Sequence, residues 1–517
     1  MNPDEVVSDL PDVRNGVRRL VFAGIAIILE VVWAVLLITR LNQYSTWIAS
    51  GTRVIGVILV LSIIGMRRNA SMKLLWIILI LSVPVFGITL YLLLGLTGTT
   101  QKMRQRMEEV DAELARFLPD NSELIEEVAE TEPNVASMMR YISGHMHFPL
   151  YRNTDVRFYP SAREGVIAQM QAMRQAKDFI FMEYHAIDDK QVYRAMERIL
   201  LEKVAEGVEV RVLYDDIGSI GFISTDFVRR SESQGIKCRD FNPVKPFVNL
   251  FLDNRDHRKI MVIDGKVGFT GGYNIGDAYF NITHPYGHWK DSGVRIVGDA
   301  VRSLTMMFLE MWNATQDTMD EDLERFFPKA RYSPVEDCRI QPYADTPIDG
   351  EQVGENVYLN LINSATRYLY IMTPYLIITD EMRTALSLAA KRGVDVRIVT
   401  PGIPDKKIVY SVTRSYYNGL VCNGVRIFEY VPGFCHSKEF VVDDKVATCG
   451  TINLDYRSLY RHFENGCLLY DCQAVHDIKA DFEATFPQCV EVTDRYLSVS
   501  RPVRLWQSVL RLFAVLL

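Results

Sequence analysis

The segments DHRKIMVIDGKVGFTGGYN (256–274) and CHSKEFVVDDKVATCGTIN (435–453) are two copies of one pattern. Each copy reads H-x-K-x4-D-x6-G-x2-N, and each shared residue of the second copy stands 179 positions after its counterpart, as His436 follows His257. A single H-x-K has no diagnostic value, because so short a pattern arises by chance. Two copies of the long pattern in one register indicate a duplicated unit.

Short runs of β-favouring residues place the repeated motif on extended chain. IMVID and FVVDD predict strands, and the segments that follow them predict a hairpin turn and a return strand. Because side chains two apart on a strand point to the same face, His257 and Lys259 lie side by side, as do His436 and Lys438. Each half therefore offers an imidazole next to an ammonium group, and each half alone is half of a site.

The sequence upstream of each motif repeats as well. KDFIFMEYHAIDD (177–189) and TRYLYIMTPYLIITD (366–380) each predict a buried strand. Each is followed by a predicted helix that ends at Gly207 or Gly393 and then by another strand. This alternation predicts an α/β layered fold with mostly parallel strand pairing.

Apolar residues are concentrated in the first hundred positions, and residues 1–100 are predicted to form a membrane anchor. At about 1.5 Å per helical residue, its apolar runs are long enough for two to three membrane spans. Pro84 and Gly87 in the last run favour a kink or a re-entrant shape. The expected hydrophobic segments are 20–38, 47–66 and 74–96. A multi-pass protein of the cell membrane follows from this reading.

Basic residues near these segments leave the side of the large domain open. Arg14, Arg18 and Arg19 favour a cytoplasmic N-terminus. Three full spans would then place the large domain outside, whereas one re-entrant segment would return it to the cytoplasm.

The rest of the chain divides by composition and repetition. Residues 101–134 are charged and helix-favouring, which predicts a solvated connecting helix. The duplicated units are expected at 135–330 and 331–500. The terminal segment 501–517 is amphipathic, and it either packs on the second unit or lies at a membrane interface.

Charge and cysteine usage narrow the function class. The net charge of −7 provides no global basic field for nucleic acid, so no nucleic-acid partner is expected. The eight cysteines show no C-x-x-C spacing, and buried thiols are predicted in preference to disulfides or metal ligands.

Two histidines suit a two-step displacement at phosphorus. One can attack phosphorus, while the other protonates the leaving alcohol and deprotonates the incoming one. Each needs an orienting acceptor, and Asp291 and Glu464 are the candidates downstream of the two motifs. Fixed positive charge and hydrogen-bond donors for the phosphoryl oxygens are expected from Lys259, Lys438, Asn274 and Asn453. The lysines perform the charge stabilisation that a metal ion would otherwise supply, so no metal or other cofactor is expected.

The aspartates of the repeated motif are ambiguous. Asp264 and Asp443 are counted among the candidate catalytic residues because both copies contain them. A bond to the motif lysine or to the local backbone is the favoured role.

The duplicated pattern resembles the signature of the phospholipase D superfamily. Other segments are similar to its bacterial-type cardiolipin synthase branch, after a hydrophobic N-terminus. These segments are YDDIGS (214–219), GGYNIGDAY, HWKDSGVRIVGDAV, TPYLIITDEM and GTINLDYRS.

This resemblance implies two pseudo-twofold-related α/β/α halves that share one active site. It also implies a phosphatidyltransferase that converts two phosphatidylglycerol molecules to cardiolipin and glycerol through a covalent phosphohistidine. In relatives the histidine of the N-terminal half is usually the nucleophile, which assigns that role to His257 and the acid–base role to His436. The residues themselves do not distinguish the two roles.

Some alternatives stay open. Attack by water would make the protein a hydrolase, and another alcohol or phospholipid could replace phosphatidylglycerol as acceptor. A non-catalytic scaffold is disfavoured by the complete His, Lys and Asn set in both copies. His462 is expected to be a surface or packing residue, since many relatives have Asn there, and His185 lies either in the core or in the pocket. A head-group contact is favoured for Asp405, Lys406 and Lys407.

Overall fold

The computed structural model describes residues 46–66, 69–92, 98–243, 254–316, 318–320, 322–329 and 332–516, together with scattered residues between 21 and 40. The predicted hydrophobic segment 20–38 lies largely outside the described residues.

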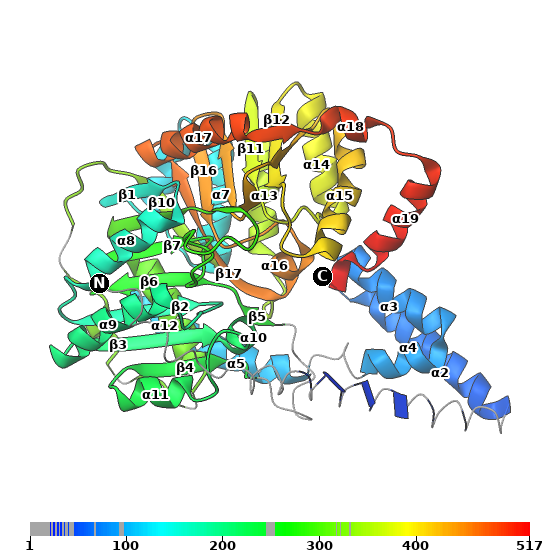
Figure 1. Cartoon of the computed structure of the whole chain (residues 1–517), viewed down its shortest axis with the longest axis horizontal. Helices are drawn as coiled ribbons and strands as arrows, with labels where there is room; N and C mark the ends of the chain where they lie inside the picture. Colours follow the sequence, from blue (N-terminus) through cyan, green and yellow to red (C-terminus); the bar gives the residue numbers. More distant parts are fainter. Residues whose placement is uncertain are drawn as a thin grey trace.

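Two sheets with the same strand order form the body of the molecule (Figure 1). The first runs β1-β9-β7-β6-β2-β3-β4, and the second runs β10-β17-β16-β15-β11-β12-β13 with β18 at its edge. The first half contains β1 (Thr154–Tyr159), β2 (Phe179–Tyr184), β3 (Glu209–Asp215), β4 (Lys237–Phe241), β5 (Arg255–Asp256), β6 (Lys259–Ile263), β7 (Val267–Gly271), β8 (His288–Lys290) and β9 (Gly293–Gly298). The second contains β10 (Arg339–Asp345), β11 (Tyr368–Met372), β12 (Asp395–Pro401), β13 (Arg426–Tyr430), β14 (Gly433–Cys435), β15 (Glu439–Val442), β16 (Val446–Gly450), β17 (His462–Tyr470) and β18 (Cys489–Glu491). The predicted α/β duplication is therefore confirmed strand by strand.

Strand pairing is mixed, so the expectation of mostly parallel sheets is wrong. Within the described residues of the first sheet, only β2, β3 and β4 pair in parallel, and β6, β7, β9 and β1 join them antiparallel. The second sheet repeats this pattern. The reason is that each motif strand continues into a hairpin, which reverses direction without a helical crossover.

Helices cover both faces of each sheet. In the first half they are α8 (Ala162–Met173), α9 (Gln191–Ala205), α10 (Asp216–Ser219), α11 (Phe227–Ser233) and α12 (Val301–Ala314). In the second half they are α13 (Val353–Ser364), α14 (Asp380–Lys391), α15 (Lys407–Val421), α16 (Tyr456–Tyr460), α17 (Gln473–Thr485), α18 (Thr493–Leu497) and α19 (Arg501–Leu512). Three short 3₁₀ helices follow α12, α17 and α19, namely η4 (Glu324–Phe326), η5 (Phe486–Gln488) and η6 (Ala514–Leu516).

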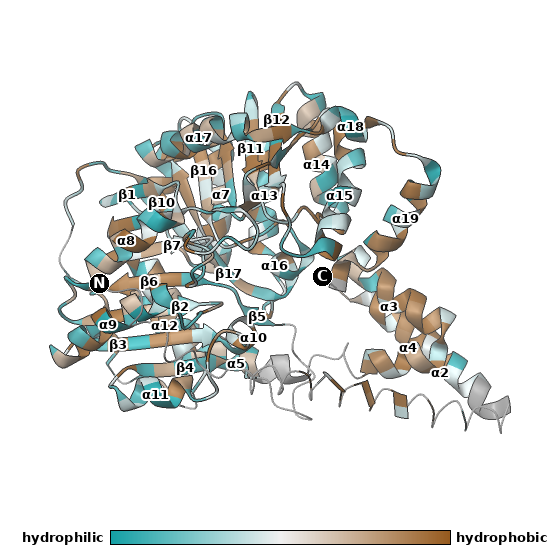
Figure 2. Ribbon diagram, in the orientation of Figure 1, coloured by the Kyte–Doolittle hydropathy of each residue, from teal (hydrophilic) through white to brown (hydrophobic). Residues whose placement is uncertain are grey.

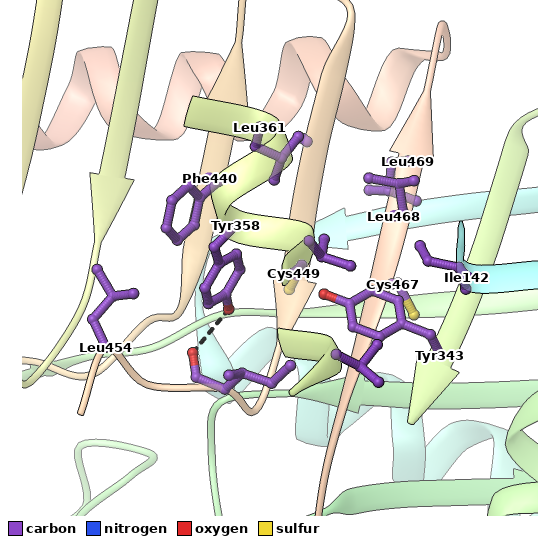
Figure 3. Packing of buried hydrophobic residues seen from close by; sticks show 14 of the residues in the cluster. Ile142, Tyr343, Tyr358, Leu361, Phe440, Cys449, Leu454, Cys467, Leu468 and Leu469 are labelled. Carbon is purple, nitrogen blue, oxygen red and sulfur yellow. Dashed lines mark hydrogen bonds between the residues drawn. The ribbon is translucent and has the colours of Figure 1, made fainter. Parts of the chain in front are cut away.

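Alternating side chains of β2 enter two different cores, as a strand buried on both faces requires. Phe179 and Phe181 pack on the α12 side, in a core that continues into the second half. Ile180 and Met182 pack on the opposite side, in the core that also holds residues of α8 and α9. Figure 3 shows the second-half part of the shared core, where the Tyr358 hydroxyl donates to the Ile452 carbonyl at 2.9 Å. The two halves are thus joined by one continuous apolar core.

The N-terminal helices project from this body, and most of their coloured length is hydrophobic (Figures 1 and 2). They are α2 (Thr46–Gly65), α3 (Ala70–Ser82) and α4 (Pro84–Leu90). The predicted segment 74–96 is interrupted at Pro84, and a Cβ added to Gly87 would lie 2.4 Å from the Leu79 carbonyl oxygen. Only glycine permits this contact, so α4 folds back against α3. In the part of the chain that the structure describes, no helix combines the length and the apolar character needed to cross a bilayer.

The segment between the N-terminal helices and the first half is folded onto the body. It forms α5 (Gly98–Leu114), η3 (Ala115–Phe117), α6 (Ser122–Ala129) and α7 (Pro133–Met146). Met107, Val110 and Leu114 of α5 are buried, and α5 packs on α12. The expectation of a solvated connecting helix is therefore wrong, because the apolar stripe of this charged helix has a partner far away in sequence.

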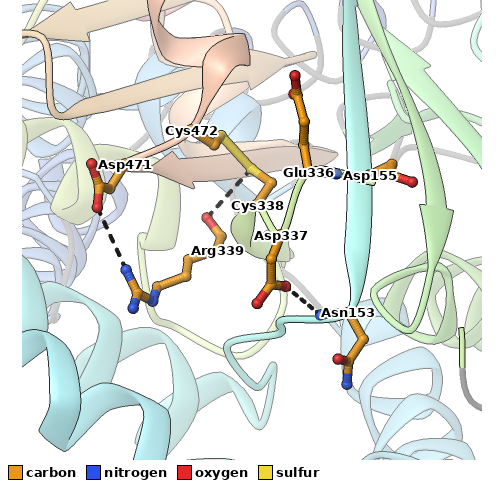
Figure 4. Close-up of a disulfide and its surroundings, with 8 residues drawn as sticks. All are labelled: Asn153, Asp155, Glu336, Asp337, Cys338, Arg339, Asp471 and Cys472. Carbon is orange, nitrogen blue, oxygen red and sulfur yellow. Dashed lines mark hydrogen bonds and ion pairs between the residues drawn. A yellow bond between two sulfur atoms is a disulfide. The ribbon is translucent and has the colours of Figure 1, made fainter. Parts of the chain in front are cut away.

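One pair of cysteines departs from the expectation of buried thiols. Cys338 and Cys472 form a disulfide with a Cα–Cα distance of 5.1 Å (Figure 4). Cys338 precedes β10 and Cys472 follows β17, and these strands pair from Arg339 opposite Tyr470. Antiparallel pairing thus brings together two residues whose positions differ by 134, which cysteine spacing alone does not reveal.

Candidate active site

A short strand from the first half crosses to the second half and positions His257. β5 pairs in parallel with the start of β17, and the His257 backbone N–H donates to the Phe463 carbonyl at 2.8 Å. This register places His257 beside Glu464, the next residue of β17.

In the same way, the short strand β14 of the second half crosses to the first half and positions His436. This strand pairs in parallel with β8 of the first half, and the His436 backbone N–H donates to the Lys290 carbonyl at 2.7 Å. The register places His436 beside Asp291. Each motif histidine therefore directly follows a short strand that is bound by the opposite half.

Both predicted orienting acids contact the histidine of the other half. His257 Nδ1 lies 2.8 Å from Glu464 Oε2, and His436 Nδ1 lies 2.6 Å from Asp291 Oδ2. Both carboxylates are fully buried. A hydrogen bond at Nδ1 fixes the ring orientation and leaves Nε2 for chemistry.

The two motif lysines are buried cations next to these histidines. Lys259 Nζ donates to the His257 carbonyl at 2.6 Å, and Lys438 Nζ donates to the His436 carbonyl. Burial lowers the pKa of Lys259 to about 7 and that of Lys438 to about 8, although nearby carboxylates oppose the shift. Desolvated ammonium groups of this kind suit an anionic ligand, whose charge would restore their usual pKa.

The surroundings of both imidazoles favour the neutral form in the free protein. Burial, reinforced by Lys259, lowers the pKa of His257 well below its usual value. Burial and Lys438 lower the pKa of His436 to about 4, against the opposing effect of Asp291. A neutral imidazole has a free lone pair, which is the state required of a nucleophile or a base.

The orienting acids differ from each other. Burial raises the pKa of Glu464 well above its usual value, and Lys259 only partly compensates. Burial acts in the same direction on Asp291, but His436 and Lys438 outweigh it and lower the pKa of this carboxyl. The site is nearly symmetric in sequence but asymmetric in its electrostatics.

The motif asparagines occupy equivalent loops after β7 and β16. Asn274 Oδ1 accepts from the Ala186 backbone N–H at 3.1 Å, and its Nδ2 donates to the Tyr279 hydroxyl at 3.0 Å. The Tyr279 ring in turn lies 5.7 Å from that of His436. Asn453 is equally buried, at 4% exposure. Asn274 therefore supports the walls of the site through its neighbours.

The structure does not bring Asp264 and Asp443 to the histidines. Each sits at the far end of its motif strand with a positive φ, 53° and 55°, in the hairpin turn. Asp264 accepts backbone N–H groups of 177–179, and Asp443 accepts those of 366–368. Both carboxylates tie the turn to the preceding strand, which agrees with the favoured backbone role.

Two further histidines lie at the site. The His462 ring centroid is 5.2 Å from that of His257, and His462 Nδ1 lies 3.5 Å from Glu464 Oε1. Of the two roles expected for His462, surface or packing, the surface role is wrong, because β17 places this ring against His257 and beside Glu464. The His185 ring lies 4.9 Å from that of His257, so the pocket alternative holds for His185.

A buried ion pair that sequence reasoning did not single out holds β5 in place. Arg255 donates to both carboxylate oxygens of Asp215 at 2.8–3.0 Å, and the Asp256 backbone N–H donates to the same carboxylate. Asp215 lies in YDDIGS (214–219), a segment that carries the family resemblance but gives no sign of this ion pair. Removing one partner of such a pair leaves a buried charge without a partner and lowers the free energy of unfolding by about 3–5 kcal/mol.

Among the described residues, one group could hold a metal ion. The ligand atoms of His257, His462 and Glu464 lie within 4.8 Å of one another. His257 Nδ1 and Glu464 Oε2 already share a hydrogen bond, and the Lys259 ammonium group exerts the largest charge effect on the pKa of His257. A neighbouring ammonium group opposes a divalent cation and favours an anion.

Comparisons with known proteins agree with this geometry. The family described as cardiolipin synthase, PLD-like domain, matches residues 170–312 and 358–486, and the family described as phospholipase D-nuclease N-terminal matches 54–95. A cardiolipin synthase of Staphylococcus aureus is 33% identical, over 90% of this chain and 96% of its own. One of Halalkalibacterium halodurans is 32% identical, over 80% and 83%.

An uncharacterized protein of Streptococcus mutans is 38% identical, over 84% of this chain and 94% of its own. Among solved structures, phosphatidylserine synthase of Haemophilus influenzae covers 73% of this chain and 99% of its own, with a TM-score of 0.54 and 15% identity, and so shares the fold. By its family match and its relatives, the chain belongs to the phospholipase D-like cardiolipin synthase family.

Proposed function

We propose that the protein is a cardiolipin synthase, which transfers a phosphatidyl group from one phosphatidylglycerol to another and releases glycerol. The observation that carries the proposal is the crosswise pair of His–carboxylate contacts, His257 with Glu464 and His436 with Asp291. Two imidazoles, one as nucleophile and one as acid and base, are what a two-step exchange of alcohols at phosphorus requires. Cardiolipin synthases among the relatives, matched over most of their length, support the same activity.

In the first step, His257 Nε2 attacks the phosphorus of the donor lipid. The P–Nε2 bond forms, the P–O bond to the glycerol head group breaks, and the glycerol oxygen takes a proton from His436 Nε2. Glu464 holds the Nδ1 side of His257. The negative charge of the bound phosphodiester raises the pKa of His436 from its low value in the free protein, so that it can carry this proton.

In the second step, the roles reverse at the same atoms. A glycerol hydroxyl of the second phosphatidylglycerol gives its proton to His436 Nε2, and its oxygen attacks phosphorus. The new P–O bond forms, the P–Nε2 bond breaks, and His257 is regenerated. Lys259 and Lys438 stabilise the equatorial oxygens in both steps, with Asn453 as a further donor. The chain's own residues thus complete the cycle without a metal ion.

The proposed location is the cell membrane, with the N-terminal helices as a multi-pass anchor. The hydrophobic surfaces of α2 and α3 support it, since residues such as Ile58, Leu61 and Leu81 expose more than half of their side chains. The match of residues 54–95 to an N-terminal family region agrees. A lipid substrate with two acyl chains requires such proximity to the bilayer.

A tyrosine and a lysine that share the Asp405 carboxylate are candidates for head-group contacts. Tyr375 donates to Asp405 at 2.6 Å, and Lys406 Nζ lies 3.0 Å from the same carboxylate while remaining largely exposed. The Tyr375 ring packs on Phe434, two residues before His436. We assign Lys406 to the phosphate or glycerol head group of an incoming lipid.

A product assay tests the proposed function. Purified protein receives phosphatidylglycerol alone, and cardiolipin, glycerol and phosphatidic acid are quantified together. The expected result is cardiolipin with an equal amount of glycerol. Phosphatidic acid without cardiolipin would replace the transferase with a hydrolase, because water would then be the second acceptor.

A further inference from the structure

The C-terminal helix α19 is amphipathic, and its apolar side is exposed. Leu505 is 71% exposed and Trp506 is 60% exposed, and Val509 and Phe513 are exposed on the same side. At 100° per residue these four side chains share one arc of the helix. Arginines and polar residues fill the opposite arc. No residue of α19 is buried.

The other side of α19 attaches it to the second half. Arg511 Nε lies 3.2 Å from the Ser415 hydroxyl, and the Arg511 guanidinium lies 4.7 Å from the centre of the Tyr416 ring. Leu510 and Leu512 pack partly against the core. The helix is thus fixed to α15 with its apolar side outward, the reverse of the arrangement that a water-facing helix adopts.

The C-terminal end of α19 lies next to the N-terminal helix α3. The segment after α19, η6, packs against both α3 and α16, and Ala514 and Val515 are buried there. Figure 1 shows α19 descending toward α3, and Figure 2 shows the hydrophobic colouring of α3 near the lower end of α19. Asn69, at the start of α3, donates to the Tyr460 hydroxyl of α16 at 3.1 Å. The short helix η6 therefore contacts α19, α3 and α16, the helix that follows the Asn453 loop.

We propose that the apolar side of α19, formed by Leu505, Trp506, Val509 and Phe513, lies in the interfacial region of an anionic lipid bilayer. A Trp at the head-group level with apolar residues beside it is the usual composition of an interfacial helix. Its exposed basic residues Arg501 and Arg504 complement anionic head groups.

This docking would orient the active site relative to the membrane. η6 at the end of α19 packs on α16, and α16 follows directly from the Asn453 loop. A bilayer that holds α19 in its surface plane would therefore hold the catalytic half at a set angle. The inference rests on the proposed membrane location but not on the reaction.

Fluorescence quenching in lipid tests the proposal on the full chain. The protein is reconstituted in vesicles of phosphatidylglycerol and phosphatidylcholine, with or without bromine on the acyl chains. The chain has six tryptophans, so the Trp506 contribution is the difference between wild type and Trp506→Phe. Quenching is expected to be strongest for bromine close to the glycerol backbone, at a depth of about 5–10 Å. A Trp506 contribution that bromine does not quench would overturn the proposal.

Two matched pairs of substitutions distinguish docking through the apolar side of α19 from a general effect of added negative charge. Leu505→Asp with Val509→Asp places two negative charges on the apolar side, and Gln507→Asp with Ser508→Asp places two on the polar side. The first pair is expected to lower Trp506 quenching by about threefold or more, and the second to leave it nearly unchanged. Equal effects of the two pairs would contradict docking through the apolar side.

The remaining outcomes are also informative. All variants should retain cardiolipin formation in detergent, where no bilayer is present, which shows that they fold. Concentration-dependent self-association through Leu505 without lipid quenching would replace the bilayer with a second copy of the chain. Because quenching needs no turnover, quenching without cardiolipin formation would refute the proposed function and leave the docking intact.

Discussion

At the scale of single residues, the two motif histidines have different surroundings. An aromatic side chain two positions before each orienting acid packs on the histidine that the acid contacts. Trp289 packs on His436, and His462 packs on His257. Trp289 has a fixed N–H and cannot titrate, whereas His462 can. Burial raises the pKa of Glu464, while His436 and Lys438 lower that of Asp291. These differences give the two imidazoles a physical basis for unequal roles.

The lowered pKa values of the motif lysines predict a loss of activity in alkaline solution. The ammonium forms exist below pKa values of about 7 for Lys259 and about 8 for Lys438, and they are lost as the pH rises through this range. For phosphatidyl-p-nitrophenol, whose leaving group needs no proton, kcat/KM should be flat in mild acid and fall above pH about 7. A stopped-flow pH profile measures this directly. A constant kcat/KM up to pH about 9 would show that the lysines keep their ordinary pKa values.

His462 is expected to act on His257 through Glu464. Its Nδ1 lies 3.5 Å from Glu464 Oε1, so an N–H at this position favours the carboxylate form. His462→Leu should lower kcat about tenfold with little change in KM. The reason is that His462 acts through Glu464 on the reacting imidazole and does not itself bind the lipid. His462→Asn, which retains an amide donor, should recover most of that loss. Steady-state kinetics on phosphatidylglycerol decide the matter, and equal kcat values for Leu and Asn would leave His462 with a packing role only.

At the scale of elements, the hairpin aspartates Asp264 and Asp443 are expected to stabilise the fold without taking part in the reaction. Burial would raise the pKa of Asp443, but hydrogen bonds from Tyr368 and Thr366 outweigh it and lower the pKa. The stability that Asp443 contributes is therefore present above its unfolded pKa and is lost as the pH falls. Asp443→Asn tolerates the positive φ but loses charge-assisted bonds, and should cost about 1–3 kcal/mol of unfolding free energy.

Thermal unfolding in detergent measures that cost, and turnover per folded site should stay near the wild-type value. Asp264→Asn is the matched change in the first half, where the carboxylate accepts from 177–179. Unchanged stability combined with abolished turnover would instead place these carboxylates in the reaction.

Much of the element layout is predictable from sequence, because it depends on local patterns. Alternating and continuous apolar runs predict the strands, and the register of 179 positions predicts two equivalent halves with the histidine–lysine pairs on one face. The parallel pairing was predicted wrongly because a strand–helix–strand pattern does not say how the motif hairpin joins the sheet. The burial of α5 against α12 also depends on a contact between distant segments.

Dependence on contacts between distant segments also explains which features of the site the sequence does not predict. Asp291 and Glu464 were predicted as orienting acids, but which histidine each serves depends on the pairing of β5 with β17 and of β14 with β8. His462 enters the site through the first of these pairings. Contacts of this kind arise only when two segments about 200 positions apart are packed together, as for His257 and Glu464.

At the scale of the whole molecule, the halves exchange essential parts. Each half supplies a histidine and a lysine, and it receives its orienting acid from the other half. One apolar core runs through both halves and keeps these parts in register. A site of this construction explains why the duplication is retained within one chain.

The most direct test of the proposed mechanism uses phosphatidyl-p-nitrophenol with single-histidine variants. Because p-nitrophenolate leaves without a proton, His436→Ala should still release about one equivalent of it in a burst and then stall with the phosphatidyl group on His257. His257→Ala should show no burst. Mass spectrometry of the stalled protein should place the phosphatidyl group on the peptide that contains His257. A burst from His257→Ala, with the phosphatidyl group on His436, would contradict the assignment of the two histidines.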